Sequence, residues 1–330
     1  MGMTWKLFVI CAILAVLAFC LVVIYIQEYR RHRKIQKQLR EELAGNRVQL
    51  QKTEEIYERF LPGELCRLAG CRRAEDLLPG RQRSFLSSVM SVSAADVSVA
   101  VTTPKQQPAA AEPGLSCFLA VAMENGGVVS RLEKAGMTAL YPEDAPGALA
   151  AAIRMCEAMD SAKETVGGFA IGLDYGTVRL RITGNEKRLS MITISESENS
   201  AEFLQKKAAK YGTRILAAAG FAGQIADFEK RCSSRLLGYF YDRTQEEAVK
   251  IYDIYDGDPV ERRQAKRRTR MIFEQGVDRF VHGFYEEARR CFVEVLKADR
   301  QDLAAREYLY RCDRFCQEPK TEADVCMEAF

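Results

Sequence analysis

The sequence predicts an α+β body with a ferredoxin-like order of strands and helices, one membrane-spanning helix before it and a small helical tail after it. Three observations give this prediction: an uncharged segment near the N-terminus, short strand-like segments that alternate with helical ones, and helix-turn-helix spacing after Pro259. We divide the 330 residues into 1–26, 27–60, 61–258 and 259–330.

Charge and cysteine content exclude several classes of protein. The 48 Lys and Arg nearly balance the 45 Asp and Glu, so the net charge of +3 is not that of a strongly basic protein and we expect no nucleic-acid partner. Eleven cysteines are an odd number, and no C-x-x-C pair occurs, which indicates reduced thiols rather than a disulfide framework. With only His32 and His282, a histidine-based zinc site is not expected.

The N-terminal segment Leu7–Ile26 predicts the membrane helix. Its twenty residues carry no charge, and at about 1.5 Å per residue they match the thickness of a bilayer's hydrocarbon core. A cleaved signal peptide is the alternative, but its charges would precede the apolar segment. Here a single Lys6 precedes the segment, and the cations cluster after it, at Arg30, Arg31, Arg33 and Lys34. The positive-inside rule therefore predicts a single-pass protein of the cell membrane with a cytoplasmic body.

The segment Gln27–Phe60 is charged and rich in helix formers. Ile35, Leu39 and Leu43 lie four residues apart, so we expect a linker helix that resembles a coiled coil but has irregular heptads. Gly45 followed by Asn46 is a candidate interruption of this helix, and Pro62-Gly63 would end it.

Strand and helix patterns alternate in the body. Residues 102–113 are expected to form a loop, and Asp174-Tyr175-Gly176 to join two strands. The resulting β-α-β-β-α-β order is ferredoxin-like, with helices on one face, and it decides no function by itself. The expected strands are Phe85–Val92, Val128–Leu132, Met137–Tyr141, Phe169–Leu173, Thr177–Ile182 and Met191–Ile194, and the expected helices are Leu115–Glu124, Ala148–Met159 and one that starts at Ala201.

The tail after Pro259 has the spacing of paired helices. Over Phe273–Arg300, small residues and aromatics stand at positions that resemble a tetratricopeptide unit, and a further helix is expected at Leu303–Phe315. One such unit cannot bury its own apolar face, so it must pack on the body or on a partner protein. The basic run 261–270 predicts either contact with anionic lipid or a solvated helix face.

Five segments in order carry a resemblance to a known family over Tyr57–Asp258. These segments are Tyr57–Pro62, Gly126-Gly127, Met137–Tyr141, Ile171–Gly176 and Gly184–Ala201. On them the chain resembles the class III adenylyl/guanylyl cyclase catalytic domain, which implies a ferredoxin-like fold, a dimer with sites at its interface, and a pair of Mg²⁺ or Mn²⁺ ions held by two carboxylates.

The resemblance places the two metal-binding aspartates at Ser91 and Ala135. Neither a hydroxyl nor a methyl group replaces a hard anionic ligand, and Lys134 would add a repelling cation. Asp96 is the alternative first carboxylate if the strand register slips by five residues, whereas Glu133 is expected to face away from the site. No metal or other cofactor is therefore expected unless an intact cyclase subunit supplies the ligands.

The resemblance also implies the other half of the family site. Arg131 occupies the position of the Lys that reads the base, and Asn199 occupies the position of a family Asn, which is retained. The transition-state Arg is replaced by Phe203, and the neighbouring Lys206 and Lys207 are poor substitutes. The base-specifying position is Ile192. Alternatively, Asn199 caps the helix that starts near Ala201 and Arg131 is a solvated strand residue.

These residues leave three functional hypotheses. The first is a membrane-anchored pseudoenzyme that acts as a dimerisation and regulatory module, as a homodimer or with another cyclase-like domain. The second is a complementary subunit that brings Arg131 and Asn199 to an active adenylate or guanylate cyclase. The third is a scaffold whose tetratricopeptide-like tail binds a protein partner. Membrane lipid is an expected partner of all three.

Overall fold

The computed structural model describes residues 25, 27–53, 63–71, 76–94, 111–161, 168–185, 188–316 and 326–329. The chain divides into two units, residues 1–63 and 64–330. The predicted membrane segment Leu7–Ile26 lies outside the described residues except for Tyr25. Within the described ranges, no helix is both long enough and apolar enough to cross a bilayer.

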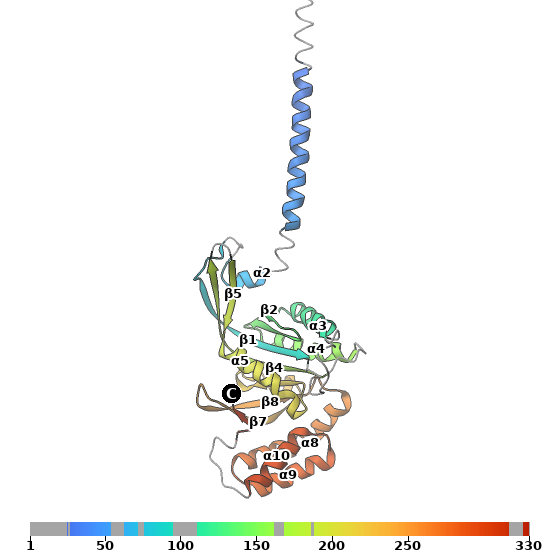
Figure 1. The fold of residues 1–330 in the computed structure, drawn as a ribbon. Helices are drawn as coiled ribbons and strands as arrows, with labels where there is room; N and C mark the ends of the chain where they lie inside the picture. The colour runs from blue at the N-terminus through green and yellow to red at the C-terminus, as the bar shows by residue number, and fades with distance from the viewer. Residues whose placement is uncertain are drawn as a thin grey trace, which may run out of the picture. The chain divides into compact units, whose positions relative to one another are not determined.

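Residues 27–53 form one uninterrupted helix (Figure 1). The interruption considered at Gly45-Asn46 is absent, because a single glycine costs a helix only about 1 kcal/mol and strong helix formers flank it. The apolar side chains of Ile35, Leu39 and Leu43 are all more than half exposed. This helix therefore presents an apolar stripe that no other described residue of its unit covers.

The second unit is built on a mixed sheet in which β1 (Gln82–Ala94) is an inner strand. β1 pairs in antiparallel fashion with β3 (Gly136–Pro142) and β4 (Phe169–Asn185), and β2 (Val128–Leu132) lies outside β3. The order β2-β3-β1-β4 confirms the ferredoxin-like prediction. The sheet continues through β6 (Ile215–Ala218), β8 (Glu247–Ile254), β7 (Ser234–Asp242) and β9 (Glu328–Ala329), and β5 (Arg188–Ile194) pairs with β4.

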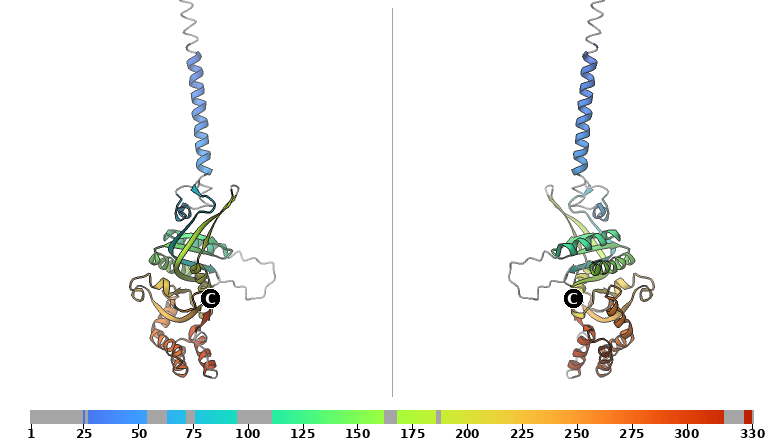
Figure 2. Two further views of the ribbon diagram at one scale, coloured as in Figure 1. Left: turned by 90° about the vertical axis from the view of Figure 1, so that its left-hand side faces the viewer. Right: turned by 90° about the vertical axis from the view of Figure 1, so that its right-hand side faces the viewer.

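Helices cover both faces of the sheet (Figure 2). On one face, α3 (Ala111–Glu124) and α4 (Ala145–Ser161) bury Phe118 and Met155 against Met90. On the other face, α5 (Glu196–Ala208) packs along β4 and β1. The expectation of helices on one face holds for α3 and α4 only. The opposite face of the sheet also has buried apolar side chains, Val89 of β1, Leu140 of β3 and Val178 of β4, and these need a second cover.

β4 is one strand of seventeen residues, whereas a break was expected at residues 174–176. β1 pairs with β4 at thirteen consecutive positions, which keeps the backbone extended through Asp174. Gly172 permits the close approach of α5, since an added Cβ would collide with the carbonyl oxygen of Ala201. Gly176, the glycine of the expected turn, also serves packing, because an added Cβ there would collide with the Ser197 hydroxyl of α5.

The predicted loop at residues 102–113 ends earlier than expected. α3 begins at Ala111, so the last three residues of that range are helical, and residues 102–110 lie outside the described part of the chain. Pro113 lies in the first turn of α3, where its missing N–H removes no helical hydrogen bond.

Three helices come after the sheet: α8 (Val260–Val281), α9 (Tyr285–Ala298) and α10 (Leu303–Phe315). They share one apolar core with α5 and β7, in which Phe273, Phe292 and Tyr308 lie with Phe240. Gly276 lets α8 and α9 cross closely, because a Cβ there would lie 2.8 Å from the Phe292 ring. Packing on the body is therefore the way in which these helices bury their apolar faces, and the tetratricopeptide resemblance stays a prediction.

A buried ionic network joins the helices to the sheet. Arg235 of β7 lies between Asp253 of β8 and Asp302, the N-cap of α10, and Lys266 of α8 contacts Asp253 and Asp258. The basic run 261–270 was expected to be either lipid-facing or solvated, but Lys266 and Thr269 are buried and only part of the run reaches solvent. The two carboxylates around Lys266 explain why this cation turns inward.

Candidate functional site

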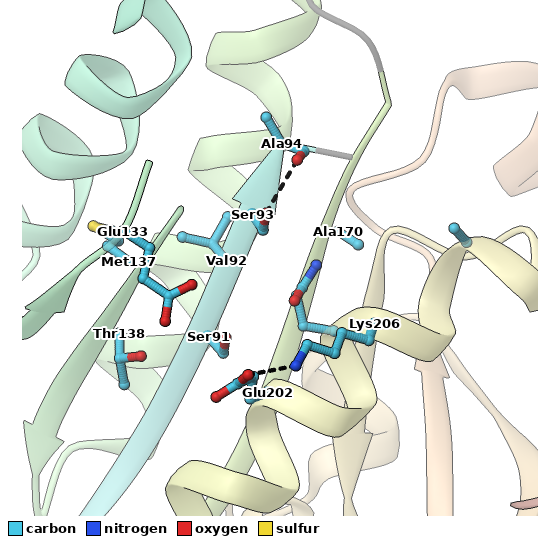
Figure 3. Close-up of a pocket in the computed structure, with 12 residues that line it drawn as sticks. Ser91, Val92, Ser93, Ala94, Glu133, Met137, Thr138, Ala170, Glu202 and Lys206 are labelled. Carbon is cyan, nitrogen blue, oxygen red and sulfur yellow. Dashed lines mark hydrogen bonds and ion pairs between the residues drawn. The ribbon is translucent and has the colours of Figure 1, made fainter. Parts of the chain in front are cut away.

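A pocket of about 320 Å³ opens at the C-terminal end of β1, between the β2–β3 hairpin and α5. Its polar lining comes from Ser91, Ser93, Glu133, Thr138, Glu202, Gln205 and Lys206. Figure 3 shows Ser91 on β1, with Glu133 from the hairpin and Glu202 from α5 on either side of it. The pocket thus contains both hydroxyl and charged groups.

The sheet register brings the two predicted metal positions to this end of β1. Ser91 pairs with Thr138 on one side and Gly172 on the other, and it is almost fully buried. Ala135 lies in the hairpin turn, and its carbonyl accepts a hydrogen bond from the Ala94 N–H at 2.8 Å. The two positions therefore lie at neighbouring strand ends, and neither supplies a carboxylate.

Glu133 lies in the pocket, although it was expected to face away from it. The reason is a β-bulge in β2. Val129 pairs with Ala139 but Arg131 pairs with Thr138, so Ser130 is an extra residue in this strand. Residues after the bulge therefore point to the face of the sheet opposite to the one that simple alternation predicts. Sequence alternation alone gives no sign of such a bulge. The pocket therefore gains one carboxylate from the hairpin at a position other than Ala135.

Arg131 is held by acidic side chains of the same chain. Its guanidinium donates to the Glu202 carboxylate at 2.8 Å and lies 3.3 Å from that of Glu133. Lys206 also donates to Glu202, one helical turn away. The hydrogen bond from Lys206 lowers the pKa of Glu202, with a further contribution from Arg131, against a smaller opposing effect of burial. Two cations thus neutralise the two carboxylates of the pocket.

Asn199 lies within the first turn of α5 and its side chain is exposed. The helix starts at Glu196 with Ser195 as its N-cap, so Asn199 is not the cap that one hypothesis expected. Glu196 and Glu198 favour this start because negative charge stabilises a helix N-terminus. Glu198 accepts hydrogen bonds from Ser130 and Thr193, at 3.3 and 2.9 Å, which fixes α5 against β2 and β5.

Phe203 packs away from the pocket lining. Its ring meets Phe240 of β7 edge-on, with 6.0 Å between centroids, and the Lys207 ammonium lies 5.2 Å from its centroid. Lys207 in turn donates to Glu328. Of the two lysines considered as substitutes for the family's Arg, only Lys206 lines the pocket. Ile192 is exposed on β5 and is not among the pocket residues.

Asp174 is a second titratable group near α5. Burial raises its pKa to about 6, against the opposing effect of hydrogen bonds from the Tyr175 backbone and from the hydroxyls of Ser200 and Ser197. Asp242 adds a smaller repulsive contribution. Asp174 therefore connects β4 to the start of α5 and ionises less readily than a solvated aspartate.

The pocket side chains do not fit a pair of divalent ions. Two metal ions need several oxygen anions, but Ser91 offers a hydroxyl and Glu202 is already bound by two cations. Among the described residues, no group of three or more His, Cys, Asp or Glu side chains is arranged to hold a metal. The alternative ligand Asp96 lies outside the described residues.

Sequence reasoning missed Glu202 and Thr138. Glu202 lies three residues after Asn199, so helical spacing would place both on one side of α5. Thr138 pairs directly with Ser91, which becomes clear once the hairpin register is known. Both signals depend on the strand register, which the motif spacing gave only approximately.

Comparisons with known proteins show which sequences and folds this chain is similar to. No protein-family model matches the chain. A terminal-differentiation-specific adenylate cyclase of Dictyostelium discoideum is 25% identical over 217 residues, which are 60% of this chain and 10% of that protein. The chain thus corresponds to about a tenth of the length of this relative.

Solved structures agree with this likeness at the level of the fold. A bacterial light-regulated adenylyl cyclase superposes with a TM-score of 0.52 at 15% identity over 67% of each chain, and a second structure with this description gives 0.53 at 14% identity. The body of this chain is therefore similar in sequence to one adenylate cyclase and has the fold of another, as the resemblance to class III cyclase domains predicts.

Proposed function

We propose that the chain is a membrane-anchored, catalytically degenerate cyclase-like protein that acts as a dimerising regulatory module. The observation that carries this proposal is the register at the end of β1. Ser91 and Ala135, at which the resemblance implies the two metal-binding aspartates, come to neighbouring strand ends and carry no carboxylate. A serine hydroxyl and an alanine methyl group give Mg²⁺ or Mn²⁺ too few anionic ligands for phosphoryl chemistry.

The charges around these positions support the same proposal. Glu133 and Glu202 are the nearest carboxylates in the pocket, but Arg131 and Lys206 are already paired with them. A divalent ion would have to displace both cations before it gained two ligands. Metal affinity should therefore be low even though the pocket contains acidic groups.

Two apolar surfaces support self-association or pairing with another cyclase-like domain. β5 presents Leu189, Ile192 and Ile194, all more than 40% exposed, on the ribbon that it forms with β4. The helix at residues 27–53 carries a second exposed apolar stripe. Exposed apolar surface of this kind is typical of protein–protein interfaces.

The proposed membrane location rests on the sequence. The uncharged segment Leu7–Ile26 would anchor the chain in the cell membrane, and the cations Arg30, Arg31, Arg33 and Lys34 would hold the body on the cytoplasmic side, next to anionic lipid.

The test is a cyclase assay of residues 27–330 with ATP and with GTP in the presence of Mn²⁺, alone and mixed with an intact cyclase domain from the same cell. We expect no cyclic product from the fragment alone and a dimer in analytical ultracentrifugation. Cyclic nucleotide formed by the fragment alone, at a rate above that of a heat-denatured sample, would contradict the proposal.

A second candidate function is that of complementary subunit in a heterodimeric cyclase. It is favoured by the exposure of Asn199 and by the partly exposed Arg131 guanidinium, which lie on or against the same helix, α5. Under this hypothesis, the mixture forms cyclic product, and Asn199→Ala abolishes it while Gln264→Ala, an exposed change on α8, does not. Partner binding by the tetratricopeptide-like tail stays a prediction.

A further inference from the structure

The chain's last described segment, Cys326–Ala329, is bound to the edge of the sheet. Glu328 and Ala329 pair in parallel with Phe240 and Tyr241 of β7, and the Met327 N–H donates to the Tyr239 carbonyl at 2.7 Å. We call Cys326–Ala329 the C-terminal strand segment. Only a short ladder of backbone hydrogen bonds holds it, so side chains must supply most of its binding.

Glu328 enters a niche of three donors at the C-terminal end of α5. Its carboxylate accepts hydrogen bonds from Lys207 at 2.9 Å, Lys210 at 2.7 Å and Tyr211 at 2.8 Å, and its side chain is only 13% exposed. Burial alone would raise the pKa of Glu328, but these three hydrogen bonds lower it to about 2. The niche is therefore selective for an anionic group.

The residues before Glu328 fit two further subsites. Met327 is buried in the core shared by α5, β7 and the helices, against Gly238, where an added Cβ would lie 2.8 Å from the Met327 sulfur. The Cys326 carbonyl accepts a hydrogen bond from Arg311 of α10 at 2.7 Å, and the Cys326 side chain is buried. Three consecutive residues are thus recognised by three different elements.

We propose that the edge of β7, with Lys207, Lys210 and Tyr211, is a docking groove for an extended segment that has an apolar residue followed by glutamate. The chain's own C-terminal strand segment occupies this groove as a releasable ligand. Addition of a strand to a sheet edge, with side-chain pockets that give selectivity, is a common mode of peptide recognition. The inference does not depend on the proposed cyclase-like function.

The groove lies on the helix that also lines the pocket. α5 carries Glu202 and Lys206 at the pocket, and the next residue, Lys207, holds Glu328. Occupancy of the groove therefore fixes the C-terminal end of the helix on which the pocket depends. Release of the segment would expose Met327 and Cys326 and would take Glu328 away from Lys207 and Tyr211, whereas Lys210 would keep its ion pair with Glu307.

The first test measures the accessibility of the Cys326 thiol in the chain of residues 27–330. Iodoacetamide labelling is followed by mass spectrometry, with the exposed Cys316 as internal reference. We expect Cys326 to react at least tenfold more slowly than Cys316 and Glu328→Ala to remove most of this protection. The matched change Glu322→Ala, in the same acidic C-terminal sequence, should leave the protection intact. Equal protection in Glu328→Ala and the unchanged chain would overturn the proposal.

A charge exchange separates docking from general loss of structure. Glu328→Lys should expose Cys326, and the further changes Lys207→Glu and Lys210→Glu should restore protection because they reverse the niche charge. In this triple variant, Cys326 should be labelled more slowly than in Glu328→Lys alone. Equal labelling rates of Cys326 in the two variants would contradict a niche that is specific for the charge of residue 328.

The second test supplies the segment in trans. A fluorescent synthetic peptide of residues 321–330, with Cys326→Ser, is titrated with the chain and followed by anisotropy. It should bind the Glu328→Ala chain at least tenfold more tightly than the unchanged chain, whose groove is filled, and the same peptide with Glu328→Ala should not bind. If the peptide binds neither chain, there is no docking groove.

Discussion

The Arg131 guanidinium and the Glu202 carboxylate are joined by a 2.8 Å hydrogen bond that links β2 to α5 across the edge of the pocket. Arg131 stands at the position where the resemblance implies a base-reading cation, yet this contact and the one to Glu133 satisfy its charge within the chain. A nucleotide that used Arg131 would first have to break an ion pair.

Glu202→Gln should remove the carboxylate that binds Lys206 and one of the two that bind Arg131, so that both cations attract anions more strongly. We expect the affinity for a fluorescent ATP analogue to rise several-fold, with a stability change below about 1 kcal/mol because the pair is partly solvated. Titration by fluorescence measures the first effect and thermal unfolding the second. The matched change Glu41→Gln, in the exposed helix, should alter neither the nucleotide affinity nor the thermal stability. An unchanged affinity in Glu202→Gln would show that the ion pair does not control access to Arg131.

The double change Ser91→Asp and Ala135→Asp should create a metal site at the end of β1. Without metal, we expect a lower unfolding midpoint, because two carboxylates would face each other near a buried strand. Added Mn²⁺ should raise the midpoint, whereas the asparagine pair at the same positions should not respond. Calorimetric titration with Mn²⁺ measures the binding. If the double variant does not bind Mn²⁺, positions 91 and 135 are not placed to hold a metal ion together.

Arg235→Met should be among the most destabilising single changes. The guanidinium is fully buried between Asp253 and Asp302 and lies 4.1 Å from the Phe273 ring centroid. Its removal leaves the buried Asp302 carboxylate without a cation, although Asp253 keeps its ion pair with Lys266. Loss of one partner of a buried pair costs about 3 to 5 kcal/mol of unfolding free energy. Chemical denaturation measures the loss. Arg289→Met breaks an exposed ion pair with Asp313 and should leave the denaturation midpoint unchanged, so equal effects of the two changes would refute the role of burial.

Gly172→Ala should force α5 away from β4. The new Cβ would meet the backbone of Ala201 and Gln205, which cannot move without shifting the helix, and overpacking of this kind costs about 1 to 3 kcal/mol. Gly45→Ala is the matched control: nothing lies near its Cβ position, and alanine should stabilise that helix by up to about 1 kcal/mol. Thermal unfolding of both variants tests the prediction, which fails if Gly172→Ala is neutral.

Asp174→Asn should stabilise the chain in a pH-dependent way. Burial raises the pKa of Asp174 from 3.8 to about 6, so the folded chain binds its proton more tightly than the unfolded chain does. Stability is therefore lost as pH rises from about 4 to 6, and the deficit is complete above pH 6. An uncharged asparagine avoids it, which gives up to about 3 kcal/mol at pH 7.5 and little near pH 4.

Unfolding midpoints at several pH values test this prediction for Asp174. Asp278→Asn, which changes an exposed carboxylate on α8, serves as the control and should leave the pH profile unaltered. A gain in stability that is the same at pH 4 and pH 7.5 would mean that ionisation of Asp174 is not the cause.

The order β2-β3-β1-β4 could be predicted because β1, β2 and β3 have clear local patterns, whereas β6, β7, β8 and β9 were not among the expected strands. Apolar, β-branched segments at Val128–Leu132 and Met137–Tyr141 became β2 and β3 with nearly the predicted bounds. Local pattern failed at Asp174–Gly176, where nearby glycines suggested a turn but long-range pairing with β1 kept the strand extended. Tertiary contact overrode local preference there.

The site could be predicted only where motif spacing along the sequence fixes it. Motif spacing placed Ser91 and Ala135 at adjacent strand ends, as the structure does. It missed Glu133 because a β-bulge changes the face of the residues after it, and it missed Lys266 because no local signal shows that Asp253 and Asp258 turn a basic run inward. Both errors come from contacts between segments, which periodicity does not encode.

The core shared by α5, β7 and the three final helices has a consequence for how the body unfolds. Phe240 and Leu237 of the sheet are buried together with Phe273 and Tyr308 of the helices, and the Tyr308 hydroxyl donates to the Leu237 carbonyl. Residues 64–330 should therefore melt in a single cooperative transition. A chain interrupted after Asp258 would leave apolar surface uncovered and become a substrate for cellular proteases, so the final helices are a condition for the cyclase-like sheet to persist in the cell.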